Sequence, residues 1–149
     1  MGRSRNPRTF LSEAETAAVR GAIRDAEQST SAEVKVVLAR YCWGSIKAKA
    51  QRVFRELGLD RTQQRNCVLF LLIVSNREFL IYGDEGVHEK VGQGFWDEVC
   101  GRMLEVFRQD RFGEGICAGV RLAGWKLAEH FPYQRDDVDE ISNEIVYRS

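Results

Sequence analysis

Oxygen-bearing side chains at four positions of this sequence could together bind a metal ion. Glu33, Asn66, Asp84 and Glu85 supply carboxylate and amide oxygens, which are the ligands that Ca²⁺ and Mg²⁺ prefer. The D-x-D-x-D-G loop of an EF-hand is absent, so no fixed ligand spacing specifies the site. One interpretation is therefore a divalent-cation site, with Ca²⁺ or Mg²⁺ as the cofactor. The other is a solvated acidic surface.

His88 adds a group that can exchange protons near neutral pH. It follows Asp84 and Glu85 closely, so it could act as a general acid or base, or be an ordinary exposed histidine. The second histidine, His130, is expected in the last turn of a helix, where its charge would offset the helix dipole. Two histidines so far apart do not indicate a zinc site. The sequence also lacks a P-loop and a G-x-S-x-G elbow.

The hydrophobic pattern predicts the elements that would position these residues. A capping box, in which Ser12 and Glu15 satisfy each other's main-chain amides, should begin the first helix. Cys67–Val74 is an unbroken apolar run, which is typical of a strand buried on both faces. Apolar spacing predicts helices at about 13–28, 46–57, 96–107 and 116–130, and strands at about 33–39, 67–74 and 79–82. A short turn of helix is expected at 87–91.

The lengths of the connections predict how the strands pair. The turn at 75–78 is too short for a crossover, so the strands on either side of it should form an antiparallel hairpin. The first two strands flank a helix and should be parallel. We therefore predict an α/β fold: a three-layer α/β/α sandwich with a small mixed sheet and the element order αβαββαα. These directions would bring Glu33, Asn66 and Asp84 to one rim of the sheet, with Glu85 and His88 close by.

Composition limits the class of protein. The chain has 149 residues, which suits one domain, and its 22 basic and 22 acidic residues argue against a nucleic-acid partner. No signal peptide is evident, and no run approaches the roughly 18 apolar residues of a membrane span. The cysteines (Cys42, Cys67, Cys100 and Cys117) are widely spaced, as expected of core residues in a reducing cytoplasm. We expect a cytoplasmic monomer.

Charge is uneven at the two ends of the chain. Residues 1–10 carry Arg3, Arg5 and Arg8 and are expected to form a flexible basic arm. Residues 133–149 are expected to form an acidic tail, with acidic side chains at Asp136, Asp137, Asp139, Glu140 and Glu144. The domain proper would then span residues 11–132. Both ends are interpreted as solvated segments or, alternatively, as docking segments for another protein.

An ordered set of short motifs resembles the TPM-domain family. That family includes a thylakoid-lumen acid phosphatase linked to photosystem II repair and a nematode modulator of acetylcholine receptors. The similarity runs from about Phe10 to Asp137 and is greatest to short bacterial members. The matching segments are Phe10–Ser12, Thr30–Val36, Asn66, Tyr82–Val91, Phe95-Trp96, Phe112–Ile116 and His130–Pro132.

The resemblance implies an α/β/α sandwich, divalent-cation binding and a weak phosphatase activity. Asn66 and Asp84 stand at matching motif positions, and Glu33 matches the acidic residue that begins the first strand. Ala32 and Cys67 depart from the pattern, because glycines are usual at both positions. Many relatives also carry a signal peptide and a membrane helix, which are not seen in this sequence.

Two hypotheses of different classes follow. In the first, Glu33, Asn66, Asp84 and Glu85 bind the cation, Asp84 and His88 are the catalytic residues, and His88 protonates the leaving group of a phosphate ester. In the second, the chain is a noncatalytic protein-interaction module in protein quality control or assembly.

Overall fold

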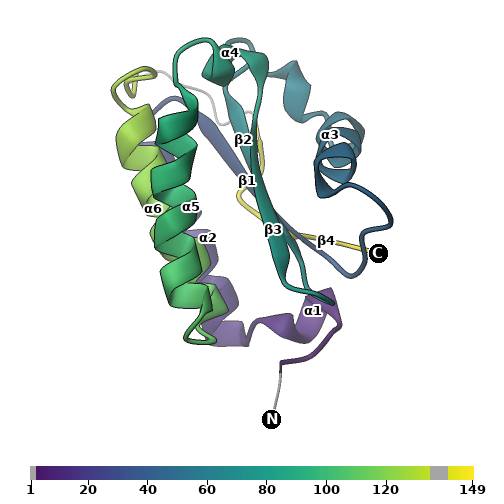
Figure 1. Cartoon of the computed structure of the whole chain (residues 1–149). Coiled ribbons are helices and arrows are strands. Elements are labelled where there is room, and N and C mark those ends of the chain that lie inside the picture. The colour runs from purple at the N-terminus through teal and green to yellow at the C-terminus, as the bar shows by residue number, and fades with distance from the viewer. Residues whose placement is uncertain (1–2, 135–140) are drawn as a thin grey trace.

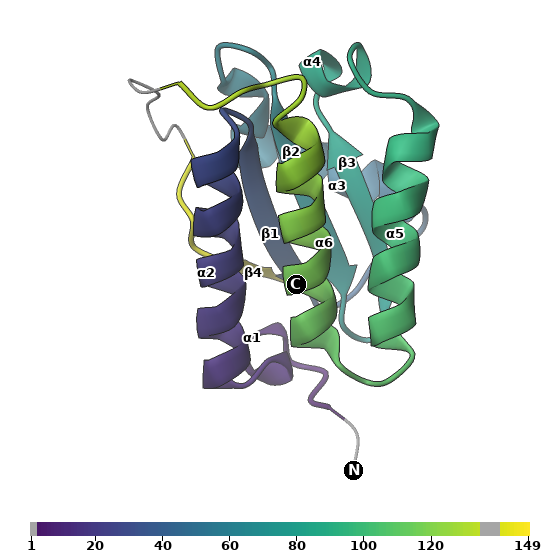
Figure 2. The same cartoon turned by 90° about the vertical axis from the view of Figure 1, so that its left-hand side faces the viewer.

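A mixed sheet lies between two layers of helices (Figure 1). The structure is a computed structural model that describes residues 3–134 and 141–149. On one face of the sheet lie α2 (Glu13–Ser29), α5 (Gln93–Phe107) and α6 (Phe112–Leu127), which Figure 2 shows side by side. On the other face lies α3 (Ile46–Glu56). The predicted three-layer sandwich is therefore confirmed.

The strand directions also agree with the prediction. β1 (Glu33–Ala39) and β2 (Cys67–Ile73) are parallel, and Glu33 stands opposite Cys67. β3 (Glu78–Gly83) runs antiparallel to β2, with Gly83 opposite Val68. A fourth strand, β4 (Val146–Arg148), was not predicted; it pairs in parallel with β1 and gives the order β3-β2-β1-β4.

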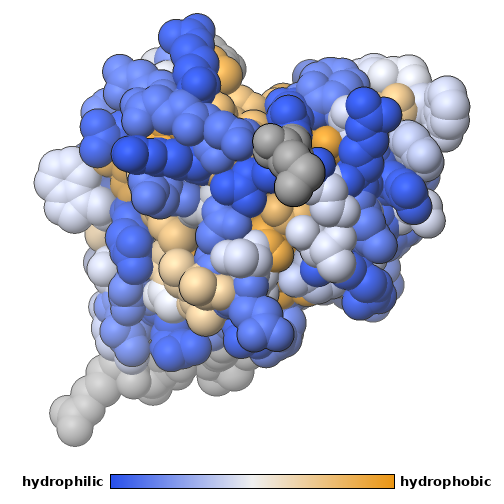
Figure 3. Space-filling view, turned by 90° about the horizontal axis from the view of Figure 1, so that it is seen from below, coloured by the Kyte–Doolittle hydropathy of each residue, from blue (hydrophilic) through white to orange (hydrophobic). Residues whose placement is uncertain are grey.

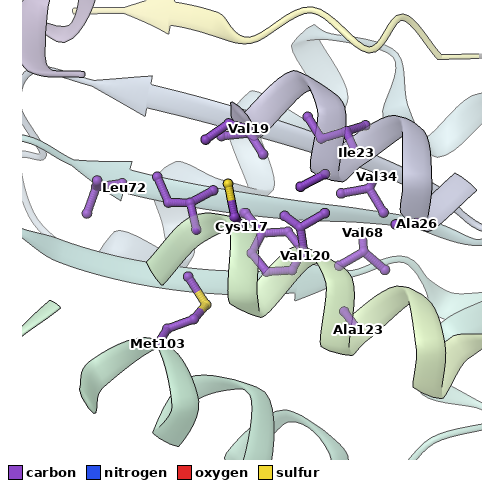
Figure 4. Packing of buried hydrophobic residues seen from close by; sticks show 14 of the residues in the cluster. Val19, Ile23, Ala26, Val34, Val68, Leu72, Met103, Cys117, Val120 and Ala123 are labelled. Atoms are coloured by element: carbon purple, nitrogen blue, oxygen red, sulfur yellow. The ribbon is translucent and has the colours of Figure 1, made fainter. Parts of the chain in front are cut away.

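The sheet divides the hydrophobic core into two clusters. All residues of β1 and β2 are buried, as expected for central strands. Val34, Val36 and Leu38 point toward the three-helix layer, whereas Val37 and Ala39 point toward α3. Figure 4 shows the larger cluster, where Val19, Ile23 and Ala26 of α2 and Cys117, Val120 and Ala123 of α6 meet side chains from the strands.

Capping groups determine where the helices begin. The Glu15 amide donates to the Ser12 hydroxyl at 3.1 Å, and the Ser12 amide donates to the Glu15 carboxylate at 2.9 Å, so the capping box is present. The short helix expected at 87–91 begins earlier, as α4 (Glu85–His88), because Asp84 caps it. α6 ends at Leu127, so His130 follows the helix and does not lie in its last turn. A 3₁₀ turn, η1, spans Leu59–Arg61.

The N-terminal segment differs from the expected flexible arm. Pro7–Phe10 form a short helix, α1, and Phe10 is buried in the larger core cluster. The Arg3 guanidinium donates to the Glu15 carboxylate at 2.8 Å and to the Phe10 carbonyl at 3.0 Å. The aromatic and cationic side chains of this segment therefore contact the rest of the domain.

The C-terminal segment is likewise part of the domain where the structure describes it. β4 extends the sheet, and the buried Lys35 ammonium donates to the carbonyls of Ser142 and Glu144 at 2.9 Å and 2.7 Å. The acidic residues Asp136, Asp137, Asp139 and Glu140 lie outside the described residues. None of the described helices is both long and apolar enough to cross a membrane.

Candidate functional site at the acidic rim

The residues that sequence analysis placed together lie at one end of the sheet, beside α4 in Figure 1. We call Glu33, Asn66, Asp84 and Glu85 the acidic rim. β1 and β2 begin at this end and β3 finishes there. The Asp84 amide donates to the Cys67 carbonyl at 3.0 Å, and the Glu33 amide donates to the Asn66 carbonyl at 3.3 Å. The main chains of these segments therefore converge as the predicted strand directions require.

Asp84 is the most constrained member of the acidic rim. Its side chain is only 6% exposed. Its Oδ1 atom accepts a hydrogen bond of 2.8 Å from the Glu85 amide and so caps α4. Both of its carboxylate oxygens also accept hydrogen bonds from Arg65, at 2.7 Å from Nε and 2.8 Å from Nη2. Two-point contact of this kind is the strong form of an arginine–carboxylate pair.

Arg65 was missed by sequence analysis. Its Nη1 atom donates to the Glu85 carboxylate at 3.0 Å, so one guanidinium bridges the two acidic side chains. Hydrogen bonding to Asp84 is the main cause that raises the pKa of Arg65 above its usual value. The main chain at Arg65 is left-handed, with φ of 50°, and this turn directs the side chain toward Asp84. The sequence signal that could have indicated this ion pair is the position of Arg65, a basic residue directly before Asn66.

Gly86 allows the loop before β2 to approach α4. Its amide donates to the Arg65 carbonyl at 2.9 Å. A Cβ atom at this position would lie 2.2 Å from the carbonyl oxygen of Gln64 and 2.6 Å from that of Arg65. Both neighbours are main-chain atoms and cannot rotate away. Glycine is therefore required for Arg65 and Asp84 to meet.

Asn66 connects neighbouring segments of the main chain. Its side chain is buried, and its Nδ2 atom donates to the Ser31 carbonyl at 3.2 Å. Its Oδ1 atom accepts a hydrogen bond of 3.4 Å from the Thr62 hydroxyl, which in turn accepts one of 3.2 Å from the Asn66 amide. The amide oxygen is thus directed toward Thr62, and its observed contacts hold the loop against the start of β1.

Negative charge around the acidic rim helps to raise the pKa of the Cys67 thiol. Burial is the largest cause that raises the pKa of Cys67, and the carboxylates of Glu33, Glu27 and Asp84 raise it further. Cys67 therefore remains a neutral thiol at physiological pH and is not a nucleophile. Glu33 is itself buried, and it stands opposite Cys67 in the pairing of β1 with β2.

His88 lies one helical turn beyond Asp84, but its ring contacts Tyr82. Its ring is exposed and packs edge-on against the Tyr82 ring, with 6.2 Å between centroids. His130 is on the loop after α6, where its carbonyl accepts a hydrogen bond of 3.3 Å from Lys90. The Asp84 carboxylate instead accepts hydrogen bonds from Arg65 and from the Glu85 amide.

Comparison with known proteins identifies the family. Residues 5–124 match the TPM domain. The chain belongs to the TPM domain family. The BA42 protein of the psychrophilic bacterium Bizionia argentinensis is 38% identical, with a TM-score of 0.89 over 93% of this chain and 95% of that one. No match to a curated protein was found.

More distant structures share the fold of this TPM domain. The N-terminal domain of a P. gingivalis protein is 20% identical, with a TM-score of 0.67 over 84% of this chain and 82% of that one. The N-terminal domain of the cg2496 protein of Corynebacterium glutamicum is 14% identical, with a TM-score of 0.63 over 91% of this chain and 80% of that one.

The acidic rim of the TPM domain provides a small donor set for a metal ion. Within residues 3–134 and 141–149, no group of three or more His, Cys, Asp or Glu side chains is arranged to hold a metal. Asp84 and Glu85 nevertheless converge on one positive charge, that of Arg65. A metal ion held by these two carboxylates alone would have to keep most of its water, as Mg²⁺ commonly does.

Proposed function

We propose that this TPM domain binds a divalent cation, Mg²⁺ or Ca²⁺, at the acidic rim, in competition with the guanidinium of Arg65. The observation that carries the proposal is the bridge from Arg65 to Asp84 and Glu85, at 2.7 Å and 3.0 Å. Two carboxylates that both reach one cationic group are also close enough to share a metal ion and its water ligands.

The proposal assigns different parts to the rim residues. Asp84 would be the fixed ligand, because its burial and its hydrogen bond to α4 hold it in place. Glu85 would be the adjustable ligand, since its side chain is 67% exposed. Glu33 and Asn66 would border the cation and add negative charge and an amide dipole. Arg65 is 40% exposed and can turn outward into water.

Competition with Arg65 predicts weak binding. A cation must replace a two-point charge-assisted contact before it gains its own ligands. Because water would fill most of the coordination sites of the cation, few protein ligands would offset the loss of the contact between Arg65 and Asp84. We therefore expect affinity in the millimolar range.

Hydrolysis of a phosphate ester is the activity that such a site would support. Asp84 and Glu85 would hold a cation that supplies a Lewis acid for a phosphoryl oxygen, and water would attack the phosphorus as the ester bond breaks. His88 would protonate the leaving group after its ring leaves the contact with Tyr82. Because this rearrangement is required, we expect slow turnover, with cation binding as the primary function.

Calorimetric titration with Mg²⁺ and Ca²⁺ tests the proposal. Arg65→Gln should bind about three- to tenfold more tightly than the wild type, because it removes a competing ion pair. Asp84→Asn should lose binding. Arg61→Gln makes the same charge change four residues earlier, in η1 (Leu59–Arg61), and should match the wild type. Equal affinity in the wild type, Arg65→Gln and Asp84→Asn would refute the site.

A further inference from the structure

A basic hollow lies at the opposite end of the sheet, where β1 and β4 finish. Two adjoining hollows of about 220 Å³ and about 410 Å³ flank the end of β4, and Tyr147, Arg148 and Ser149 line both. We call them together the basic groove. Its cationic lining consists of Arg8, Arg40, Lys49, Arg52 and Arg148. Figure 3 looks onto this end of the molecule and shows a surface that is mostly hydrophilic.

Positive charge in the basic groove is only partly balanced. Glu56 is the acidic side chain that lines it, and it forms an ion pair with Arg148. Partial burial is the largest cause that lowers the pKa of the Lys49 ammonium. Arg52 and Arg148 lower it further, whereas Cys42, whose effect exceeds that of either arginine, and Glu56 raise it. An anion placed among these cations would relieve their mutual repulsion.

Lys49 is held in position for such an anion. Its ammonium donates to the carbonyl oxygen of Tyr41 at 2.7 Å and to a main-chain oxygen of the last residue, Ser149, at 2.8 Å. An ammonium group has three N–H donors, so these contacts leave one for a ligand. Lys49 is therefore a fixed donor, whereas Arg52 is exposed and can adjust to a ligand.

An aromatic pair stands beside the groove. Trp43 is 87% exposed and Tyr41 is 45% exposed. Their ring centroids are 5.9 Å apart, with 31° between the ring planes. The bond from Lys49 to the Tyr41 carbonyl connects this pair to the cationic lining. A flat aromatic surface can stack on a nucleic-acid base while neighbouring cationic side chains bind its phosphate.

We propose that the basic groove and the Tyr41–Trp43 pair bind a nucleoside monophosphate. The phosphate would lie among Lys49, Arg52 and Arg148, and the base would stack on Trp43. Arginine and lysine supply charge-assisted donors for phosphate oxygens, and indole rings stack on bases of any sequence. This site is independent of the acidic rim, because it lies at the other end of the sheet and binds the opposite charge.

Amide and indole NMR titrations with AMP and with inorganic phosphate test this proposal. AMP should shift the indole N–H signal of Trp43, which Trp43→Phe identifies, and leave that of the exposed Trp125 on α6 unchanged. AMP should bind at least about tenfold more tightly than inorganic phosphate, since stacking adds to charge. Lys49→Met and Arg52→Gln should each weaken AMP binding about fivefold or more.

Lys47→Gln is the matched control, because Lys47 is exposed on α3 and lines neither hollow. It should bind AMP within about twofold of the wild type. The proposal is overturned if AMP does not bind at millimolar concentration, or if phosphate binds as tightly as AMP. It is also overturned if Arg52→Gln and a folded Lys49→Met both bind AMP like the wild type. Binding confined to vesicles of anionic phospholipid would likewise overturn it.

Discussion

The two ends of the sheet differ in how far their charges are balanced by neighbouring side chains. At the acidic rim, Asp84 and Glu85 receive a counter-charge from Arg65 within the same set of loops. At the basic groove, five cationic side chains share one acidic side chain, that of Glu56, among the lining residues that the structure describes. The sequence has a net charge of zero, so its composition hides this difference. The charges of the acidic rim are compensated internally, so a cation must displace Arg65 there. The basic groove, in contrast, can accept an anion.

The ends also differ in how firmly their main chains are fixed. The acidic rim combines a buried capping aspartate with the close approach of Gly86 to the loop before β2. The basic groove is open and is lined largely by long side chains. We therefore expect substitutions at the rim to change stability as well as cation binding, and substitutions at the groove to change mainly AMP binding.

The largest expected difference between the ends is thiol reactivity. Cys67 lies in the central strand β2 at the acidic rim, where burial raises its pKa, and Cys42 is half-buried near the basic groove. Alkylation of the native protein by iodoacetamide should modify Cys42 about a thousandfold faster, because Cys67 reacts only when the sheet opens. Peptide mass spectrometry measures both rates. Similar rates would mean that this end of β2 is open.

Gly86→Ala should destabilise the domain by about 3 kcal/mol, because the new Cβ would overlap main-chain oxygens that cannot move aside. Urea unfolding followed by circular dichroism measures the change. Gly101→Ala is the matched control: a Cβ there meets nothing within 4 Å, and α5 should gain about 0.5–1 kcal/mol. An unchanged midpoint for Gly86→Ala would contradict the close approach of the two loops.

Asp84→Ala should cost about 2 kcal/mol of unfolding free energy, because it removes the cap of α4 and a buried acceptor. Glu85→Ala should change stability by less than about 0.5 kcal/mol, since its side chain is 67% exposed. The same urea experiment compares them. Equal costs would show that the acidic rim is not organised around Asp84.

The smallest expected effect is that of Glu56→Gln in the basic groove. Removing a half-exposed partner of Arg148 should change stability by no more than about 0.5 kcal/mol. The same substitution should tighten AMP binding about twofold, because Arg148 is then less compensated. Weaker AMP binding in Glu56→Gln would place the anion elsewhere on the surface.

Much of the fold follows from patterns that act over short distances. The run Cys67–Val74 predicted a central strand, and the capping box at Ser12 predicted where α2 begins. The convergence of Glu33, Asn66 and Asp84 followed from the directions of three strands. These features depend on periodicity and connection length, which are visible in the sequence.

Other features depend on tertiary contacts that no local pattern encodes. β4 is a three-residue strand, which is too short to show periodicity, and it is stabilised by pairing with β1. Arg65 reaches Asp84 because of a left-handed turn that its residue type does not predict. The basic groove draws side chains from α1, α3, β4 and the residue that follows β1, so it exists only once the chain has folded.

The most direct test of the account is an amide NMR titration of the wild type and Arg65→Gln with Mg²⁺, followed by AMP. We predict that Mg²⁺ shifts the amide signals of Asp84 and Glu85, more readily in Arg65→Gln, and leaves those of Lys49 and Arg148 in place. AMP should then shift the second pair and spare the first. Mg²⁺ shifts that are absent from Asp84 and Glu85, or that are unaffected by Arg65→Gln, would contradict the competition between metal and guanidinium.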